Sequence, residues 1–195
     1  MSNKAEKTLV VLKPDTIQRN LIGDIISRFE RAGLKIIAMK FLLPTKEQAY
    51  KHYVKSEEEI VALGNRSIEG NKKRGIEITG DPKEIGQKIM DRLVEYLALS
   101  PVVAMVLEGN NSIQIVRKLV GSTEPTSSDV GTIRGDYTID SYDLADGDNR
   151  AVRNLVHASA NQVDADYEIP VWFKDSEIFT YKNVRDAVLY DEKFN

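Results

Sequence analysis

The sequence predicts an α+β sandwich, in which helices cover a face of a single sheet. Four short apolar runs, rich in β-branched residues, are spread along the 195 residues. The longer segments between them repeat their apolar residues every three to four positions, as amphipathic helices do. With 42% hydrophobic residues the chain can bury one substantial core, so we expect a single domain.

The predicted strands are apolar along almost their whole length, which is typical of strands buried on both faces. They span residues 8–12, 34–43, 102–107 and 155–157. Pro14 ends the first strand, so Lys13 faces a turn, where a lysine binds an anion or is simply solvated. The fourth strand ends at His157, so an imidazole side chain lies at the end of this strand.

The predicted helices combine a helical period with recognisable ends. They lie at 22–32, 45–53, 81–99, 110–120 and 163–173. The first is closed by Gly33 as a left-handed cap, and the second opens with Thr45 in a capping box. In the third, Asp81 is the cap and Pro82 the first helical residue. Asn110 is the expected cap of the fourth. Beyond Lys174 we expect short helices and coil.

A segment of different composition follows Tyr53. Residues 54–81 hold three consecutive glutamates, a stretch rich in Gly, Asn and basic residues, and then IEIT, which predicts a short strand at 76–79. We interpret the segment as an insertion. Its basic residues either attract a nucleotide or RNA or, as we favour, lie in a solvated loop. They are Arg66, Lys72, Lys73 and Arg74.

Two further segments between the third and fourth strands lack a period. Residues 121–136 form a predicted loop with glycines, hydroxyl side chains and Arg134, which are groups that bind phosphate, although such loops are commonplace. Residues 138–149 hold four aspartates. These suggest a metal, but their spacing is not that of a calcium loop, so a solvated loop is favoured.

The order of these elements is strand, helix, strand, helices, strand, helix, loop, strand, helix. Two split right-handed βαβ units in this order give a ferredoxin-like sandwich with four antiparallel strands. That arrangement alone decides no function.

His157 and Glu168 are the candidate reactive pair. Eleven residues separate them, which lets a helix fold back on its strand and bring the carboxylate to the ring. A carboxylate accepting from one ring nitrogen fixes the tautomer and frees the other nitrogen as nucleophile or base. The alternative is a satisfied structural histidine, and this stretch alone leaves it open.

Overall charge and composition narrow the class of protein. A net charge of −3 argues against a constitutive partner of nucleic acid or of a membrane surface. The absence of cysteine excludes disulfides and thiolate metal sites and is compatible with a reducing compartment. The N-terminal residues lack a signal-length apolar run, and no run approaches a membrane span. We therefore expect a cytoplasmic protein.

Five blocks of sequence, in order and with their internal spacing, resemble the nucleoside diphosphate kinase family. They are the opening TLVVLKPDTIQRNLIGDIISRFERAGLKIIAMK, then PVVAMVLEG, GTIRGD, NLVHAS and EIPVWF. The resemblance implies one such domain over residues 1–195, with insertions at about 54–88 and 138–148.

By this resemblance, the protein moves the γ-phosphate of a nucleoside triphosphate to a nucleoside diphosphate by ping-pong transfer. His157 is the implied nucleophile, Glu168 orients its ring, and Ser159 supports them. The implied substrate-binding residues are Lys13, Tyr53, Ile89, Arg117, Thr123, Arg134 and Asn154. The resemblance also implies Mg²⁺ carried by the nucleotide phosphates, with no metal held by the protein, and a homo-oligomer, hexamer or tetramer.

The chain departs from the family pattern at several positions. Ile89 stands where a phenylalanine stacks on the base, Ala160 replaces an aspartate, and Glu124 replaces an asparagine. A catalytically weak relative that binds nucleotide or a partner is therefore the alternative, although His157 and the arginines are kept. A ferredoxin-like RNA-binding module is less consistent, because the predicted strands are aliphatic and lack stacking aromatics.

Overall fold

The computed structural model describes residues 5–54 and 56–190, which form a four-stranded antiparallel sheet in the order β2-β3-β1-β4. The strands are β1 (Glu6–Leu12), β2 (Lys35–Leu42), β3 (Val102–Gly109) and β4 (Val156–Ala158). This order and direction are those of the predicted ferredoxin-like sandwich. The four strands predicted for the sheet are present, with their ends within two residues of the expected positions.

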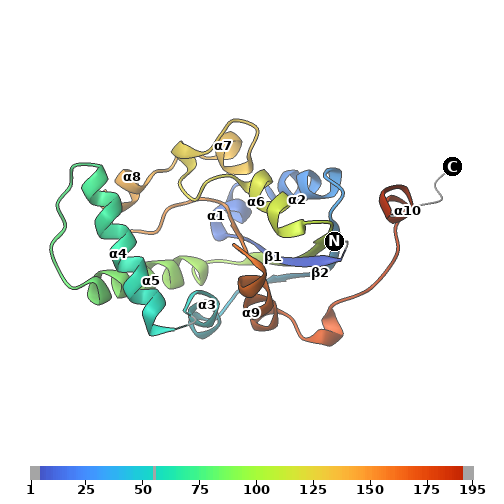
Figure 1. Cartoon of the computed structure of the whole chain (residues 1–195), viewed down its shortest axis with the longest axis horizontal. Coiled ribbons are helices and arrows are strands. Elements are labelled where there is room, and N and C mark those ends of the chain that lie inside the picture. The colour runs from blue at the N-terminus through green and yellow to red at the C-terminus, as the bar shows by residue number, and fades with distance from the viewer. Residues whose placement is uncertain (1–4, 55, 191–195) are drawn as a thin grey trace.

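Helices pack on both faces of the sheet (Figure 1). They are α1 (Pro14–Gln18), α2 (Ile22–Arg31), α3 (Lys46–Tyr53), α4 (Glu57–Lys73), α5 (Pro82–Leu97), α6 (Ser112–Val120), α7 (Ile133–Tyr137), α8 (Tyr142–Gly147), α9 (Gln162–Trp172) and α10 (Val184–Tyr190), with short 3₁₀ turns η1 (Pro125–Ser127) and η2 (Asp175–Glu177). Helices α2, α6 and α7 contribute to the core on one face, and α3, α5 and α9 to the core on the other. None of the helices in the described ranges is long and apolar enough to cross a membrane.

The expectation that helices cover a face of the sheet is therefore too narrow. In β1, Leu9 and Val11 point into one core, whereas Val10 and Leu12 point into the other, and all four are fully buried. A strand with no solvent-facing side has no reason to alternate apolar and polar residues. The continuous apolar run TLVVL is thus the direct result of a two-sided sheet.

The largest correction concerns residues 54–81, where the sequence predicts a solvated basic loop and a strand at 76–79 within an insertion. Most of the segment is the 17-residue helix α4, and residues 76–79 belong to no strand in the described structure. Gly64 contributed to the error, because glycine is needed where α4 approaches α5 closely. A side chain at Gly64 would collide with the carbonyl of Pro82, and one at Gly86 would collide with the carbonyl of Ile60. Gly64 marks a close helix-to-helix contact rather than a loop.

Residues 138–149 also differ from the predicted solvated loop. They contain α8, whose N-cap Ser141 accepts a hydrogen bond from the Leu144 amide at 3.2 Å. Each of the four aspartates pairs with an arginine, and the side chains of Asp143, Asp146 and Asp148 remain 48–69% exposed. The pairs are Arg74 with Asp143 and Asp146, Arg92 with Asp146, and Arg150 with Asp140 and Asp148. Arg74, one of the predicted solvated cations, therefore joins α8 to the end of α4.

Smaller differences follow from local geometry. The turn predicted after Lys13 is the short helix α1, and the predicted loop 121–136 contains the start of α7. The N-cap of α6 is Asn111, one residue later than predicted. In α9 the helical spacing is present, but Val163 is 75% exposed, because the buried face carries Glu168 and its neighbours instead. The tail holds η2 and α10 as expected, and residues 191–195 lie outside the described range.

Candidate active site

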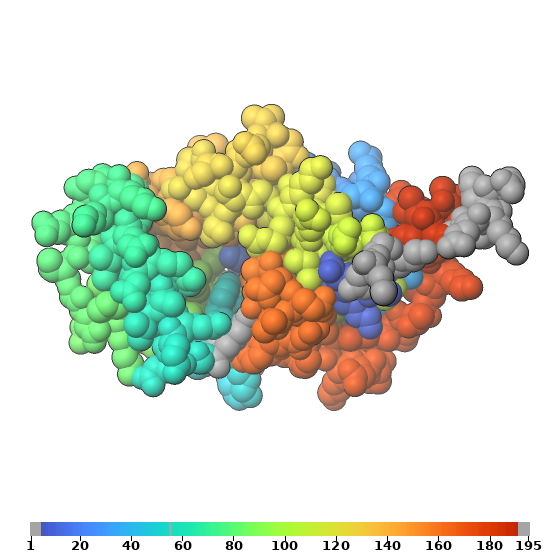
Figure 2. Space-filling view, viewed as in Figure 1, coloured from blue at the N-terminus to red at the C-terminus, as the bar shows by residue number. Residues whose placement is uncertain are grey.

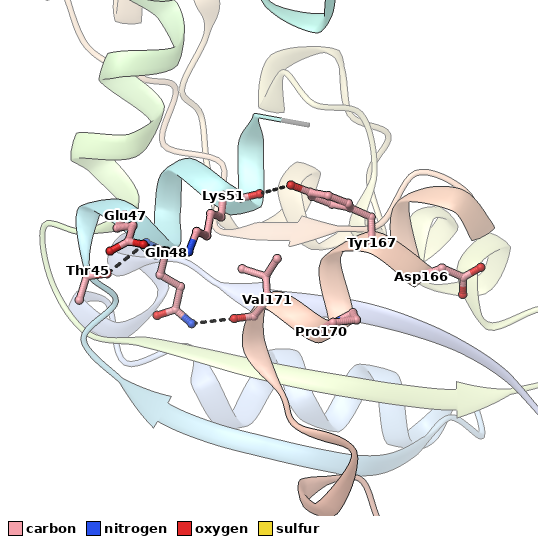
Figure 3. A pocket seen from close by; sticks show the side chains of 8 residues that line it. All are labelled: Thr45, Glu47, Gln48, Lys51, Asp166, Tyr167, Pro170 and Val171. Carbon is pink, nitrogen blue, oxygen red and sulfur yellow. Dashed lines mark hydrogen bonds and ion pairs between the residues drawn. The ribbon is translucent and has the colours of Figure 1, made fainter. Parts of the chain in front are cut away.

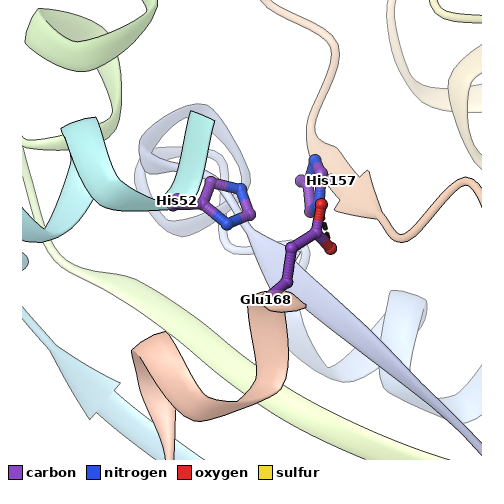
Figure 4. Close-up of side chains that lie close together, drawn as sticks. All are labelled: His52, His157 and Glu168. Atoms are coloured by element: carbon purple, nitrogen blue, oxygen red, sulfur yellow. Dashed lines mark hydrogen bonds and ion pairs between the residues drawn. The ribbon is translucent and has the colours of Figure 1, made fainter. Parts of the chain in front are cut away.

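His157 and Glu168 meet where β4 and α9 lie together. β4 places His157 opposite Val11 of β1, and α9 folds back over the strand. Nε2 of His157 lies 3.0 Å from Oε2 of Glu168, as Figure 4 shows. The hydroxyl of Ser159 donates to the same carboxylate oxygen at 2.7 Å and accepts from the Leu9 amide. The contact that the eleven-residue spacing predicts is therefore present.

This contact fixes the tautomer of His157. A carboxylate oxygen can only accept, so Nε2 carries the ring proton and the lone pair stays on Nδ1. Nδ1 makes no hydrogen bond to any residue in the described part of the chain. The imidazole side chain is 18% exposed, whereas the carboxylate of Glu168 is only 5% exposed. Nδ1 is thus the nitrogen available to attack or deprotonate an entering group.

His52, at the end of α3, is a member of the site that the sequence did not single out. Its ring is buried and lies edge-on to that of His157, with 4.2 Å between the ring centres. The indole of Trp172 donates to Nδ1 of His52 at 3.2 Å. Nitrogen and oxygen atoms of His52, His157 and Glu168 come within 4.8 Å of one another, a spacing that a metal ion tolerates. Trp172 and the carboxylate already use the lone pair of His52 and the Nε2 proton of His157.

Lys13 and Asn154 form the centre of a second cluster. Nζ of Lys13 donates to Oδ1 of Asn154 at 2.8 Å, and the amide nitrogen of Asn154 donates to the carbonyl of Thr123 at 2.8 Å. Lys13 is almost fully buried. Burial, together with the charges of Arg134 and Arg153, lowers the pKa of Lys13 to about 7. An arriving anion would favour the charged ammonium and raise that pKa again.

Arg134 lies beside this cluster and binds backbone rather than side chains. Its Nε donates to the carbonyl of Asn154 and its Nη2 to that of Val156, while Nη1 donates to the carbonyls of Gly121 and Ser122. Four of the five guanidinium donors are therefore directed at carbonyl oxygens. Burial, followed by the charge of Arg117, lowers the pKa of Arg134 to about 10.

The remaining predicted residues are less tightly held. Tyr53 is next to His52, with its ring centre 6.3 Å from that of His157. Its buried hydroxyl has no hydrogen-bond partner in the described structure, and burial raises its pKa. Arg117 in α6 and Thr123 in the segment after α6 are exposed, while Ile89 is half-buried on α5. The structure thus links Tyr53 to the histidine cluster and leaves Ile89 on a separate helix.

Arg153 and Tyr96 also belong to the second cluster, around Lys13 and Asn154. Neither residue was predicted from the sequence. The guanidinium of Arg153 lies over the Tyr96 ring, 4.0 Å from its centre, and Lys13 Nζ is 5.7 Å from the same centre. Nη1 of Arg153 is buried without a hydrogen-bond partner in the described ranges. Three cations, with a spare donor on one of them, therefore gather in one place. Such a cluster suits a polyanionic ligand.

The surface is hollowed at this position. Figure 2 shows the depression between the lobe made by α4, the segment at about 121–137 and the start of α9. A separate open groove of about 810 Å³ lies between α3 and α9 (Figure 3). It is lined by Thr45, Glu47, Gln48, Lys51, Asp166, Tyr167, Pro170 and Val171. None of the predicted site residues lines this groove, so we assign it no role in the chemistry.

Comparison with known proteins gives a consistent result. The family model described as nucleoside diphosphate kinase matches residues 6–62 and 82–178, so the unmatched stretch between them falls in the α4–α5 region. A nucleoside diphosphate kinase of Pyrobaculum aerophilum is 48% identical over 178 residues, which are 89% of this chain and 97% of that protein.

Two solved structures are similar throughout. The crystal structure of an NDP kinase from Pyrobaculum aerophilum superposes with a TM-score of 0.86 at 46% identity, covering 90% of this chain and all of that one. A transition state mimic of nucleoside-diphosphate kinase from Borrelia burgdorferi, with bound vanadate and ADP, has a TM-score of 0.79 at 38% identity, covering 94% and 96% of the two chains.

Proposed function

The chain belongs to the nucleoside diphosphate kinase family, and from this premise we propose how its residues move the γ-phosphoryl group of a nucleoside triphosphate to a nucleoside diphosphate. The observation that carries the proposal is the 3.0 Å contact between His157 Nε2 and Glu168. It leaves Nδ1 with the lone pair, beside a cluster of cations.

In the first half-reaction, the lone pair of His157 Nδ1 forms a bond to the γ-phosphorus. The bond from that phosphorus to the bridging oxygen breaks, and the diphosphate leaves with the electron pair. In the second, a terminal oxygen of another diphosphate attacks the phosphorus, and the phosphorus–nitrogen bond breaks. Glu168 holds the Nε2 proton throughout and stabilises the positive charge that the ring gains on phosphorylation.

The cations and hydroxyl groups of the second cluster are proposed to position the phosphates. Lys13, Arg117 and Arg134 neutralise phosphate charge, and the hydroxyl of Thr123 donates to a phosphate oxygen. Asn154 contacts the sugar hydroxyl, Tyr53 lies beside the reacting phosphate, and Ile89 lies on the side of the base. The pKa of Lys13, about 7 without ligand, is expected to rise on binding.

Mg²⁺ is proposed to enter as part of the nucleotide substrate. Mg²⁺ prefers oxygen ligands and keeps several waters, so phosphate oxygens suit it better than the nitrogen-rich group of His52, His157 and Glu168. A phosphate-bound Mg²⁺ neutralises charge that develops during transfer. Lys13, Arg117, Thr123 and Arg134 are therefore proposed to bind the phosphates, and none of them is assigned as a metal ligand.

We also infer that the protein is a cytoplasmic homo-oligomer without a nucleic-acid partner. The edge strand β2 exposes Met39 and Phe41, and Leu43 directly after it is also exposed; Phe41 and Leu43 are more than 60% exposed. Alternate apolar residues along a sheet edge are suited to burial by another copy. Light scattering coupled to size exclusion would give the number of copies, expected to be four or six. A strictly monomeric mass would remove this inference.

Phosphoryl transfer to the protein is directly measurable. Incubation with γ-labelled ATP and Mg²⁺ is expected to give one alkali-stable, acid-labile phosphate per active chain, and a nucleoside diphosphate should then remove the label. His157→Asn should abolish labelling, because the amide offers no nucleophile of comparable strength. Asp24→Asn is the control, because Asp24 is an exposed residue in the first turn of α2. Labelling that persists in His157→Asn would falsify the assignment.

The alternative, a weak relative that binds nucleotide without useful transfer, predicts a different result. Such a protein would retain affinity for diphosphates but label slowly and to a small fraction. The stoichiometry of the first turnover separates the two, because it counts competent sites independently of nucleotide affinity.

A further inference from the structure

The backbone just before His157 adopts an unusual conformation. In the described ranges, the non-glycine residues with positive φ are three asparagines and Leu155, whose φ is +66°. Asparagine tolerates the left-handed region, but a branched apolar side chain such as leucine rarely occupies it. The Val156 amide donates to the Asn154 carbonyl at 2.7 Å, which closes a three-residue turn around Leu155. Leu155 is fully buried, so the surrounding structure must hold this conformation.

Residues at the start of α1 hold the turn from one side. The Leu155 amide donates to Oδ2 of Asp15 at 3.0 Å. The Leu155 carbonyl accepts from the Lys13 amide at 2.8 Å and from the Thr16 hydroxyl at 2.6 Å. The other oxygen of Asp15 accepts from the Thr16 amide at 3.1 Å. Both polar groups of Leu155 are therefore bound by residues 13–16, which the sequence predicts only as a turn.

The position of this turn connects the two halves of the site. Directly before it, Asn154 directs its side chain to Lys13 and Thr123 in the cation cluster. Two residues after it, His157 pairs with β1 and meets Glu168. The direction in which the chain leaves Leu155 thus sets where the phosphate-binding groups lie relative to Nδ1 of His157.

We propose that Asp15 and Thr16 are positioning residues for phosphoryl transfer, which hold Leu155 in the left-handed conformation and thereby fix the cation cluster at the correct distance from His157. This proposal rests on the proposed function. Asp15 is not a general base in this reaction, because both its oxygens accept from backbone amides and it is 8% exposed. Its hydrogen bonds act through the backbone of residues 154–157, and its charge also raises the pKa of Lys13.

The test compares variants that remove single hydrogen bonds. Thr16→Val removes the hydroxyl with little change of shape, whereas Thr16→Ser keeps it. Asp15→Asn replaces one of the two accepting oxygens with a donor. Asp24→Asn is the control, because Asp24 is an exposed acidic residue in the first turn of α2. Thr16→Val keeps the test informative if Asp15→Asn does not fold.

The main readout is the rate of phosphohistidine formation in a single turnover at saturating nucleotide, counted per folded chain. Thr16→Val and Asp15→Asn are expected to lower it by about tenfold to a hundredfold, because small displacements of reacting groups cost this much. The dissociation constant for a diphosphate should change by less than about threefold in Thr16→Val, since this variant keeps the binding groups and the charge of Asp15. Thr16→Ser and Asp24→Asn should keep the wild-type rate.

A second readout does not depend on activity. The Nε2 proton of His157, held by Glu168, is expected to give a sharp signal in the NMR spectrum that broadens in Thr16→Val and not in Thr16→Ser. Wild-type labelling with unchanged rate and spectrum in Thr16→Val and Asp15→Asn would overturn the positioning role alone. An unlabelled wild type whose spectrum still responds to Thr16→Val would overturn the proposed function instead.

Discussion

The region around Arg134 and the region around Arg74 both depend on arginines, but the arginines bind different partners. Arg134 is buried and donates to the backbone carbonyls of residues 121, 122, 154 and 156. Arg74 is partly exposed and pairs with carboxylates of α8. A buried donor bound to carbonyls cannot be removed without leaving those carbonyls unpaired, whereas surface ion pairs exchange readily with water. The site is therefore rigid where the substrate's phosphates are proposed to lie and adjustable at its rim.

The largest expected effect comes from replacing Arg134 with methionine. The variant should lose about 3 kcal/mol or more of unfolding free energy, because buried carbonyls lose their donors. Arg74→Met, the matched substitution at the rim, should lose less than about 1 kcal/mol. Urea denaturation followed by circular dichroism measures both. Equal losses in the two variants would contradict the difference between the regions.

The close packing of α4 on α5, in the region around Arg74, gives a second test of how stability responds to substitution there. Gly86→Ala should destabilise the protein by about 1–3 kcal/mol, because the added methyl group collides with the Ile60 carbonyl. Gly70→Ala, also in a helix but with nothing within 4 Å of the added methyl, should be neutral or stabilise by up to about 1 kcal/mol. Thermal unfolding of the two variants reports the difference. A destabilised Gly70→Ala would show that α4 tolerates no change at all.

The smallest expected effect concerns Lys13 and depends on pH. The folded chain releases the lysine proton near pH 7, whereas the unfolded chain holds it to about 10.5. The cost of burying the charge is therefore fully present below pH 7 and is relieved as the pH rises toward 10.5. Lys13→Met should gain about 1 kcal/mol at pH 7, since relief of this cost exceeds the hydrogen bond lost to Asn154.

The pH profile separates this explanation from a simple gain in packing. Relative to Lys13→Met, wild-type stability should rise between pH 7 and pH 10, as measured by urea denaturation at several pH values. The exposed Lys118→Met serves as the control and should follow the wild-type profile. Parallel profiles for wild type and Lys13→Met would mean that the buried lysine keeps its proton throughout.

The sequence predicted the features that depend on local periodicity. The four strands and the contact of His157 with Glu168 follow from short patterns of apolar residues and spacing, and the antiparallel arrangement follows from the order of the elements along the chain. The roles of the predicted substrate-binding residues still await experiment. His52 was visible in the sequence but not assigned, because its proximity to His157 depends on how α3 crosses the sheet.

Other features were hidden for identifiable reasons. Gly64 indicates a loop when the sequence is considered locally, and only the neighbouring helix explains it. The aspartates of residues 138–149 suggested solvent or metal because their arginine partners include residues more than 50 positions earlier. The conformation of Leu155 has no sequence signature at all, because leucine is not a residue that favours positive φ.

The ion pairs between Arg74, Arg92 and the aspartates of α8 bear on how this protein could be redesigned. If either α8 or the α4–α5 helix pair were transplanted alone into a shorter homologue, charged side chains at the junction would be left without their ion-pair partners. A successful chimera would have to carry the two segments as a matched set.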